Sequence, residues 1–228
     1  MSVNRKIRSF AKGTLQIFSL SIVALLIQNF VGNQYSIPSE SMDPTFEVGD
    51  RVWLNKLPGN NLDNYERGDI VIFDTTARVN EECRLPVKPN HTFQRIWWQT
   101  RTTLGLEPVT QEEYTTAFTK RLVGLPGDKL EIKQAQVYLN DEPLAEDYFA
   151  EVSEKYQDRL YDLPKTIVPA DQVVVLGDNR VWSCDSSSWG FLPATQLRGK
   201  VTARIWPPSR VTLLETPEYE AQTTAAEE

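Results

Sequence analysis

The stretch TKRLVGLPGDKLEIKQAQVYLNDEPL, residues 119–144, decides the fold class of this chain. It contains three short apolar runs, at 121–125, 130–132 and 137–139, and a Pro-Gly turn follows the first of them. Short apolar runs bounded by turn residues are typical of β-strands. The second and third runs lie close enough together to predict a hairpin.

The same pattern recurs on both sides of this stretch. Apolar runs bounded by Gly, Pro, Asn and Asp lie at Arg51–Leu54, Ile70–Phe73, Val173–Leu176 and Val201–Ile205. After the first 32 residues, no segment keeps the 3.6-residue period of a long helix. We therefore predict a mainly β fold, with a mostly antiparallel β domain over residues 33–212.

One part of this domain, residues 79–117, has little clear periodicity, and we interpret it as an insertion. Within it, Thr110 and Glu113 have the spacing of a capping box and predict a short helix. Trp97 and Trp98 fit either the membrane surface or a small satellite core. The composition does not decide between these two places.

The N-terminal segment has the composition of a membrane anchor. From Gly13 to Ser39 no side chain is charged, and a helix over residues 13–32 is long enough to cross a hydrocarbon core of about 30 Å. A cleaved signal peptide is the alternative, but the run lacks a small-x-small ending, so we predict an uncleaved single-pass transmembrane helix. Residues 1–12 are basic without an acid, which predicts a cytoplasmic N-terminus and an extracytoplasmic domain.

Net charge disfavours a nucleic-acid partner. The formal charge is -7, and beyond residue 12 there remain 20 basic and 31 acidic residues. A nucleic-acid-binding domain is usually basic, so this acidic body argues against one. Residues 213–228 are acidic and poor in apolar side chains, which predicts a disordered tail.

Cysteine and histidine are too few to indicate a metal site. Cys83 and Cys184 could form one disulfide in an oxidising compartment, but sequence spacing does not show whether they are close in space. With the single His91 they have no metal-ligand spacing. We expect neither a metal nor a cofactor.

Two segments contain residues that could carry chemistry. Ser39 and Ser41 lie in IPSESMDPT, residues 37–45, directly after the predicted anchor, and Lys120 begins an apolar run. Burial disfavours the ammonium form of a lysine and lowers its pKa, so a buried lysine can act as a base. Taken singly, such residues are more often an ordinary loop serine and a solvated lysine.

Taken together, the polar segments resemble the type I signal peptidases. The resemblance rests on four blocks in the family's order: PSESMDPT (38–45), RGDIV (67–71), KRLVGLPGD (120–128), and GDNR (177–180) followed by Ser183, Asp185 and Ser186. It covers residues 35–74 and 119–193 in patches. It implies a membrane-bound serine endopeptidase that removes N-terminal signal peptides after small-x-small sites and needs no cofactor.

The resemblance also implies the role of each reacting group. Ser41 would be the nucleophile, and Lys120 would be the general base that takes its proton. Ser39 and the backbone N–H of Ser41 would form the oxyanion hole, where donors meet the negative charge that develops on the scissile carbonyl oxygen.

Three further residues would support this pair. Ser183 would hydrogen-bond to Lys120 and orient it. Asp178 would pair with Arg121, which fixes the strand that carries Lys120. These roles, too, are implied by the resemblance alone.

The chain departs from the family pattern around another supporting residue, Asp185. Val181 and Trp182 stand where the family has polar residues, and Ser187 stands where an arginine or histidine often follows. Asp185 would then lack its usual cationic partner, unless Arg180 or another group replaces it.

Cleavage after small residues implies shallow apolar pockets. The candidates lie beside the matched blocks: Tyr35, Ile37, Met42, Phe46, Phe118 and Leu122. The expected partners are preproteins with signal peptides and the lipid bilayer, with the export translocon as a further candidate. The expected location is the bacterial cytoplasmic membrane or the thylakoid membrane.

Three alternatives share part of this evidence. A Ser-His-Asp mechanism would need His91, but no motif surrounds that residue. A self-cleaving Ser-Lys protease of the repressor type usually carries a DNA-binding region in place of an anchor. The non-enzyme alternative is a membrane-tethered β domain with a binding or scaffolding role and weakened or no protease activity, in which Ser41 and Lys120 are incidental.

Overall fold

The computed structural model of the chain describes residues 14, 16, 18–23, 30–75, 83, 117–149, 157, 160–217 and 219. The predicted cytoplasmic segment, residues 13, 15, 17 and 24–29 of the predicted anchor, and the insertion apart from Cys83 and Ala117 lie outside the described residues. The same holds for the predicted helix at 110–116 and for His91, Trp97 and Trp98.

The part of the N-terminal segment that the structure describes is helical. Residues 14, 16 and 18–23 have helical backbone, with exposed apolar side chains such as Phe18 and Leu20. Searched within the described residues, the chain contains no helix that is both long and apolar enough to cross a membrane.

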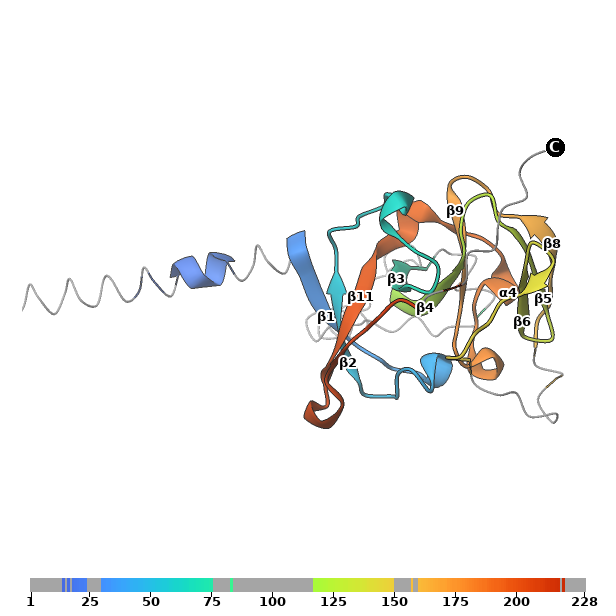
Figure 1. Cartoon of the computed structure of the whole chain (residues 1–228). Coiled ribbons are helices and arrows are strands. Elements are labelled where there is room, and N and C mark those ends of the chain that lie inside the picture. Colours follow the sequence, from blue (N-terminus) through green and yellow to red (C-terminus); the bar gives the residue numbers. More distant parts are fainter. Residues whose placement is uncertain are drawn as a thin grey trace, which may run out of the picture.

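The described strands form two antiparallel sheets (Figure 1). The larger has the order β1-β2-β11-β3-β4-β9-β10, with β12 paired to β11, and the smaller has the order β7-β6-β5-β8. The strands of the larger sheet are β1 (Gly32–Ser36), β2 (Arg51–Asn55), β3 (Ile70–Asp74), β4 (Ala117–Gly124), β9 (Gln172–Leu176), β10 (Leu192–Pro193), β11 (Leu197–Trp206) and β12 (Thr212–Leu213). Those of the smaller sheet are β5 (Lys129–Lys133), β6 (Gln136–Leu139), β7 (Glu142–Pro143) and β8 (Leu163–Ile167).

Short helices connect these strands. They are η2 (Glu40–Met42), η3 (Leu62–Asn64), η6 (Arg180–Trp182), α4 (Ser186–Trp189), η7 (Ala194–Gln196) and η8 (Pro208–Arg210). The prediction of a mainly β, mostly antiparallel domain is therefore confirmed for the part of the chain that the structure describes.

Each predicted strand overlaps an observed one, and the predicted hairpin is β5–β6. Lys133 pairs with Gln136, which leaves a two-residue turn at Gln134 and Ala135. Both turn residues have positive φ, 48° and 70°, as the tight hairpin turns that match the strand twist require. The strands β1 and β8 were not predicted, because their sequences GNQYS and LPKTI lack a continuous apolar run.

The central strands are apolar throughout because both of their faces are buried. On β3, Val71 and Phe73 belong to one core cluster, whereas Ile70 and Ile72 belong to another. The next strand, β4, likewise places Leu122 and Val123 in two different clusters. A polar side chain on β4 therefore enters a buried environment.

The C-terminal segment corrects one expectation. Leu213 lies in β12, the Thr216 hydroxyl donates to Asp69 at 2.7 Å, and the Tyr219 hydroxyl lies 2.9 Å from that of Tyr148. The prediction of disorder from residue 213 is therefore wrong for residues 213–217 and 219. A few apolar and hydroxyl side chains find partners on the body, which the acidic composition of the tail conceals.

Candidate active site

Ser41 lies in a short, tightly held turn after β1. It is the second residue of η2, and only 6% of its surface is exposed. Two backbone hydrogen bonds between Ile37 and the 49–50 segment close the base of the turn. Met42, the residue after Ser41, and Phe46, further along the chain, are both buried in the core. These contacts fix the backbone on which Ser41 stands.

Lys120 is buried in the middle of β4, with 4% of its surface exposed. Successive side chains of a strand point to opposite faces, so Lys120 shares a face with Phe118 and Leu122. Its ammonium nitrogen lies 5.3 Å from the centre of the Phe118 ring. On the neighbouring side, β9 ends at Leu176, opposite Arg121, so β9 does not extend beside Lys120.

The structure brings Ser41 and Lys120 together across 79 positions of sequence. The Nζ atom of Lys120 donates a hydrogen bond of 2.7 Å to Ser41 Oγ and one of 3.2 Å to the carbonyl oxygen of Thr119. Burial lowers the pKa of Lys120 from 10.5 to about 8, although the carboxylates of Asp185 and Asp178 act in the opposite direction. A lysine in this position exists as a neutral amine in a substantial fraction of molecules near pH 8.

Ser39 lies at the start of the same turn. It is the N-cap residue of η2, and its hydroxyl is 3.4 Å from Ser41 Oγ. Its side chain is exposed, so the Ser39 hydroxyl is open to a bound molecule. The first N–H groups of a helix have no acceptor within it, and the Ser41 N–H belongs to this first turn.

The turn after β9 contacts the backbone carbonyl group of Ser41. The backbone N–H of Asn179 donates to the Ser41 carbonyl oxygen at 3.1 Å. A Cβ atom at Gly177 would lie 2.5 Å from that carbonyl oxygen, and it would also overlap Ser183 Oγ. Only glycine leaves room for this close approach.

This gives a testable expectation for Gly177→Ala. The added methyl group meets backbone, which cannot move aside as a side chain does, so we expect the free energy of unfolding to fall by about 1–3 kcal/mol. Urea unfolding followed by circular dichroism measures the change. Adding Ser183→Gly removes only one of the two overlaps, so the double variant should remain less stable than Ser183→Gly alone. Equal stability of those two would contradict the steric account.

Ser183 does not form the predicted hydrogen bond to Lys120. Its hydroxyl is buried without a hydrogen-bond partner among the described residues, and Lys120 donates to Thr119 and Ser41. Ser183 does lie near the pair, because it packs against Gly177, beside the carbonyl of Ser41. The predicted hydrogen bond between Ser183 and Lys120 is therefore not formed in this structure.

Arg121 and Asp178 form the predicted pair, deep in the fold. Arg121 Nε donates to Asp178 Oδ1 at 2.8 Å, and its Nη2 donates to Asp178 Oδ2 at 2.7 Å. The remaining nitrogen, Nη1, donates to the carbonyl oxygen of Gly68 at 2.8 Å. Both side chains are almost fully buried, and this bidentate geometry is the strong form of an arginine–carboxylate contact.

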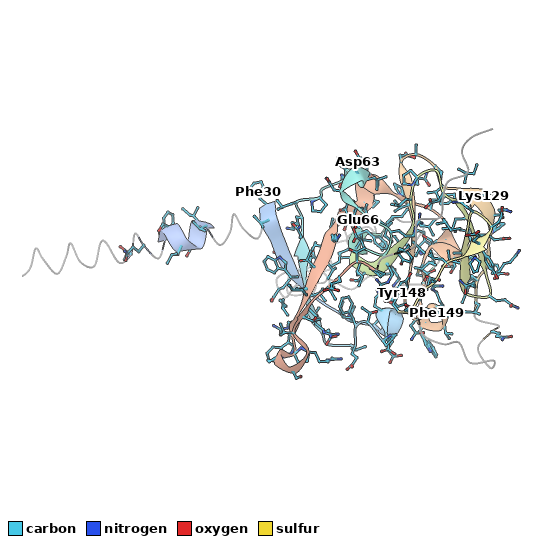
Figure 2. The ribbon with its side chains drawn as sticks, viewed as in Figure 1. Phe30, Asp63, Glu66, Lys129, Tyr148 and Phe149 are labelled. Carbon is cyan, nitrogen blue, oxygen red and sulfur yellow. A yellow bond between two sulfur atoms is a disulfide. The ribbon has the colours of Figure 1, made fainter. Side chains whose placement is uncertain are left out.

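Two aromatic residues cover the arginines of this region. Tyr148 and Phe149, labelled in Figure 2, lie beside Arg121 and Arg180, whose Cζ atoms are 3.8 Å and 4.7 Å from the respective ring centres. An aromatic face attracts a guanidinium group and also shields it from water. The pair of Arg121 and Asp178 is therefore isolated from solvent on this side.

Asp185 is bound by groups other than an arginine. Its Oδ2 accepts the backbone N–H of Gly177 at 2.8 Å, and its Oδ1 accepts the N–H and hydroxyl of Ser187 at 3.1 and 2.7 Å. Arg180 does not replace the missing cation, because it pairs with Glu146. Ser187, the residue that departs from the family pattern, thus supplies two of the donors to Asp185.

A disulfide joins Cys83 to Cys184. The sequence left this pairing open, and the structure resolves it. Cys184 lies between Ser183 and Asp185, so the bridge ties this part of the site to the segment around residue 83.

The six candidate pocket residues fall into two groups. Ile37, Met42, Phe46 and Leu122 have at most 2% of their surface exposed and pack in the cores. Tyr35 and Phe118 are only partly buried. Among the six, these two are the ones that offer surface to a bound chain, and their role in a pocket remains a prediction.

Sequence reasoning assigned no role to Thr45, Gly177 or Ser187. The only signal for the first two was their place inside the matched blocks. Ser187 was noticed as a departure from the pattern, but its contact with Asp185 depends on the conformation of α4.

Comparison with known proteins gives a consistent family assignment. The family model described as "Signal peptidase, peptidase S26" matches residues 10–206. The "Probable signal peptidase I-2" of Synechocystis sp. is 35% identical over 193 residues, which cover 85% of this chain and 72% of that protein. The "Signal peptidase I" of Leptolyngbya laminosa is 33% identical, and its match covers 86% of this chain and 80% of that protein.

A plant protein is similar as well. The chloroplastic "Thylakoidal processing peptidase 1" of Arabidopsis thaliana is 30% identical over 209 residues. That match covers 92% of this chain and 52% of the plant protein.

Proposed function

The chain belongs to the signal peptidase family, peptidase S26, and we propose that Ser41 and Lys120 carry out its reaction, the removal of signal peptides from preproteins. One observation carries the assignment of the two residues. The buried Lys120 Nζ is 2.7 Å from Ser41 Oγ, within the range for proton transfer, and burial lowers the pKa of Lys120 to about 8.

The reaction proceeds in two halves. Neutral Lys120 takes the proton of the Ser41 hydroxyl while Oγ attacks the scissile carbonyl carbon, which gives a tetrahedral oxyanion. The oxyanion collapses, the peptide C–N bond breaks, and the ammonium of Lys120 protonates the leaving amine. The signal peptide is now an ester of Ser41. Lys120 then takes a proton from water, whose oxygen attacks the ester carbon. The ester C–O bond breaks, the ammonium of Lys120 returns the proton to Ser41 Oγ, and the signal peptide leaves with a free carboxyl group.

The oxyanion is stabilised by the Ser39 hydroxyl and the backbone N–H of Ser41. The Ser39 Oγ lies 3.4 Å from Ser41 Oγ, at the start of the turn that also carries the Ser41 N–H. Asp178 and Arg121 hold β4 in place, and Asp185 and Ser187 hold the turn around Gly177.

The substrates are preproteins that are cleaved after a small-x-small sequence. We assign the pocket to Tyr35 and Phe118, the two partly buried members of the candidate pocket residues, and the Phe118 ring centre lies 5.3 Å from Lys120 Nζ. For a preprotein with an Ala-x-Ala site, we expect cleavage after the second alanine, and Ala→Phe at that position should abolish it. Mass spectrometry of the mature product reads out the site. Equal cleavage of the Phe variant would contradict this specificity.

The enzyme acts at a membrane. We assign residues 13–31 to a single-pass anchor with a cytoplasmic N-terminus, because the segment is uncharged and follows a basic one. Gly32, the last residue of the anchor predicted from sequence, is instead the first residue of β1. The location is the cytoplasmic or thylakoid membrane, in agreement with the cyanobacterial and thylakoidal relatives. Ser41 follows the anchor by ten residues, so the site stays near the bilayer and the preproteins emerging there, with the export translocon as a candidate neighbour.

The rate should depend on pH through Lys120. Only the neutral amine accepts a proton, and the neutral fraction rises as the pH rises through the pKa of about 8. At pH 6, kcat/KM should be about one hundredth of its alkaline plateau. A fluorogenic peptide assayed between pH 5.5 and 9.5 tests this, with affinity for a non-cleavable analogue as the control for binding. A flat profile would count against lysine as the base.

A further inference from the structure

Thr45 lies four residues after Ser41 in the same turn, and its polar groups contact two separate parts of the fold. Its hydroxyl donates to Asp178 Oδ2 at 2.5 Å and accepts from Arg121 Nη2 at 3.3 Å. Its carbonyl oxygen accepts from Arg204 Nη1 at 2.9 Å. Thr45 thus links the Ser41 turn to the buried ion pair on one side and to β11 on the other.

A displacement of Thr45 would be transmitted to Ser41, because the turn is compact. The N–H of Asp43 donates to the carbonyl of Glu40 at 3.0 Å, and the N–H of Phe46 donates to that of Met42 at 2.8 Å. These overlapping bonds make residues 40–46 a continuous bonded unit.

The Asp178 carboxylate is where the two halves of the site meet. It receives two donors from Arg121, the residue next to Lys120, and one from Thr45. Its chain neighbour Asn179 donates to the Ser41 carbonyl. One buried carboxylate therefore connects the backbone of the nucleophile turn to the backbone of the strand that bears the base.

We propose that Thr45 is a positioning residue, whose hydroxyl sets the distance between Ser41 and Lys120 by tying the nucleophile turn to Asp178. The inference rests on the proposed roles of Ser41 and Lys120. Misplacement of reacting atoms by about 1 Å typically costs about a hundredfold in rate. Thr45→Val keeps the volume and removes the hydroxyl, so kcat should fall about tenfold to a hundredfold, whereas KM should change little.

The test compares four full-length variants in detergent with a preprotein that has an Ala-x-Ala site. Thr45→Val and Thr45→Ala both remove the hydroxyl. The alanine variant is included because alanine is smaller than threonine and cannot clash, so it can be tested even if the valine variant does not fold. Thr45→Ser keeps the hydroxyl and should recover most of kcat. Thr216→Val is the matched control, because it removes another threonine hydroxyl that donates to a buried aspartate, Asp69, at 2.7 Å. Rates are expressed per Ser41 that reacts with a serine-directed probe, so unfolded molecules are not counted.

The inference stands if the valine and alanine variants lose kcat while Thr45→Ser and Thr216→Val keep it. It is overturned if Thr45→Val or Thr45→Ala retains the wild-type kcat, if Thr45→Ser is as slow as they are, or if Thr216→Val loses as much. Ser41→Ala, assayed in parallel, separates the two claims. Activity in Ser41→Ala would remove the proposed function itself, whereas an inactive Ser41→Ala beside a fast Thr45→Val would remove only the role of Thr45.

Discussion

Ser41→Ala and Lys120→Met are each expected to lower the processing of a preprotein with an Ala-x-Ala site by at least about a thousandfold. Nucleophile and base act as a unit, so loss of either removes the whole covalent route. Ser41 Oγ and Lys120 Nζ are hydrogen-bonded at 2.7 Å, and no other described side chain is within hydrogen-bonding distance of that amine. Single-turnover assays, with product separated by gel, measure the loss.

Folding must be shown to survive in both variants. Ser41→Ala removes one hydroxyl, and Lys120→Met replaces a buried amine by an apolar side chain of similar length, so neither should lower the melting temperature. Lys133→Met is the matched control, because Lys133 is exposed and pairs only with Glu131 among the described residues. It should keep full activity. Processing at the wild-type rate by either site variant would exclude the proposed mechanism.

Asp178→Ala is expected to lower the free energy of unfolding by about 3–5 kcal/mol. The substitution leaves the guanidinium group of Arg121 buried without its counter-charge, and a buried unpaired charge strongly destabilises the folded state. The variant also frees the Thr45 hydroxyl and the strand that carries Lys120, so activity should fall together with stability. Urea unfolding followed by circular dichroism gives the free energy.

Asp141→Asn provides the comparison for that prediction, because Asp141 has a positive φ of 73°, which asparagine adopts more readily than alanine. Asp141 also forms ion pairs, with Lys129 and Lys165, but all three side chains are about half-exposed. Ion pairs between exposed side chains contribute little to stability, so this variant should be nearly as stable as the wild type. If both variants lost the same stability, burial would not be the reason for the importance of Asp178.

Much of the fold followed from local sequence pattern. The central strands are continuous apolar runs because both faces of the sheet are buried, so β3, β4 and β9 were easily predicted. The edge strand β1 and the strand β8 were missed because their side chains alternate or face solvent. The contacts of Thr216 and Tyr219 were missed because a local acidic composition says nothing of a distant partner.

The candidate site likewise has residues that the sequence predicted and contacts that it did not. The resemblance placed Ser41, Lys120, Arg121 and Asp178 together, since each lies inside a matched block. It did not give the partner of Asp185, because the hydroxyl and N–H of Ser187 reach it only through the conformation of α4.

Nor could it give the hydrogen bonding of Ser183 or the bridge between Cys83 and Cys184. Each depends on distances that only the folded backbone fixes.

The most direct test of the paired roles of Ser41 and Lys120 is the pH dependence of covalent labelling at Ser41. An Ala-x-Ala peptide phosphonate reacts with an activated serine, and intact-mass and peptide mass spectrometry give both the rate and the site of the adduct. We predict one adduct, on Ser41, whose rate of formation rises to a plateau with a midpoint near pH 8, and no adduct in Lys120→Met. Labelling of another residue, or labelling of Ser41 at the same rate in Lys120→Met, would contradict the account.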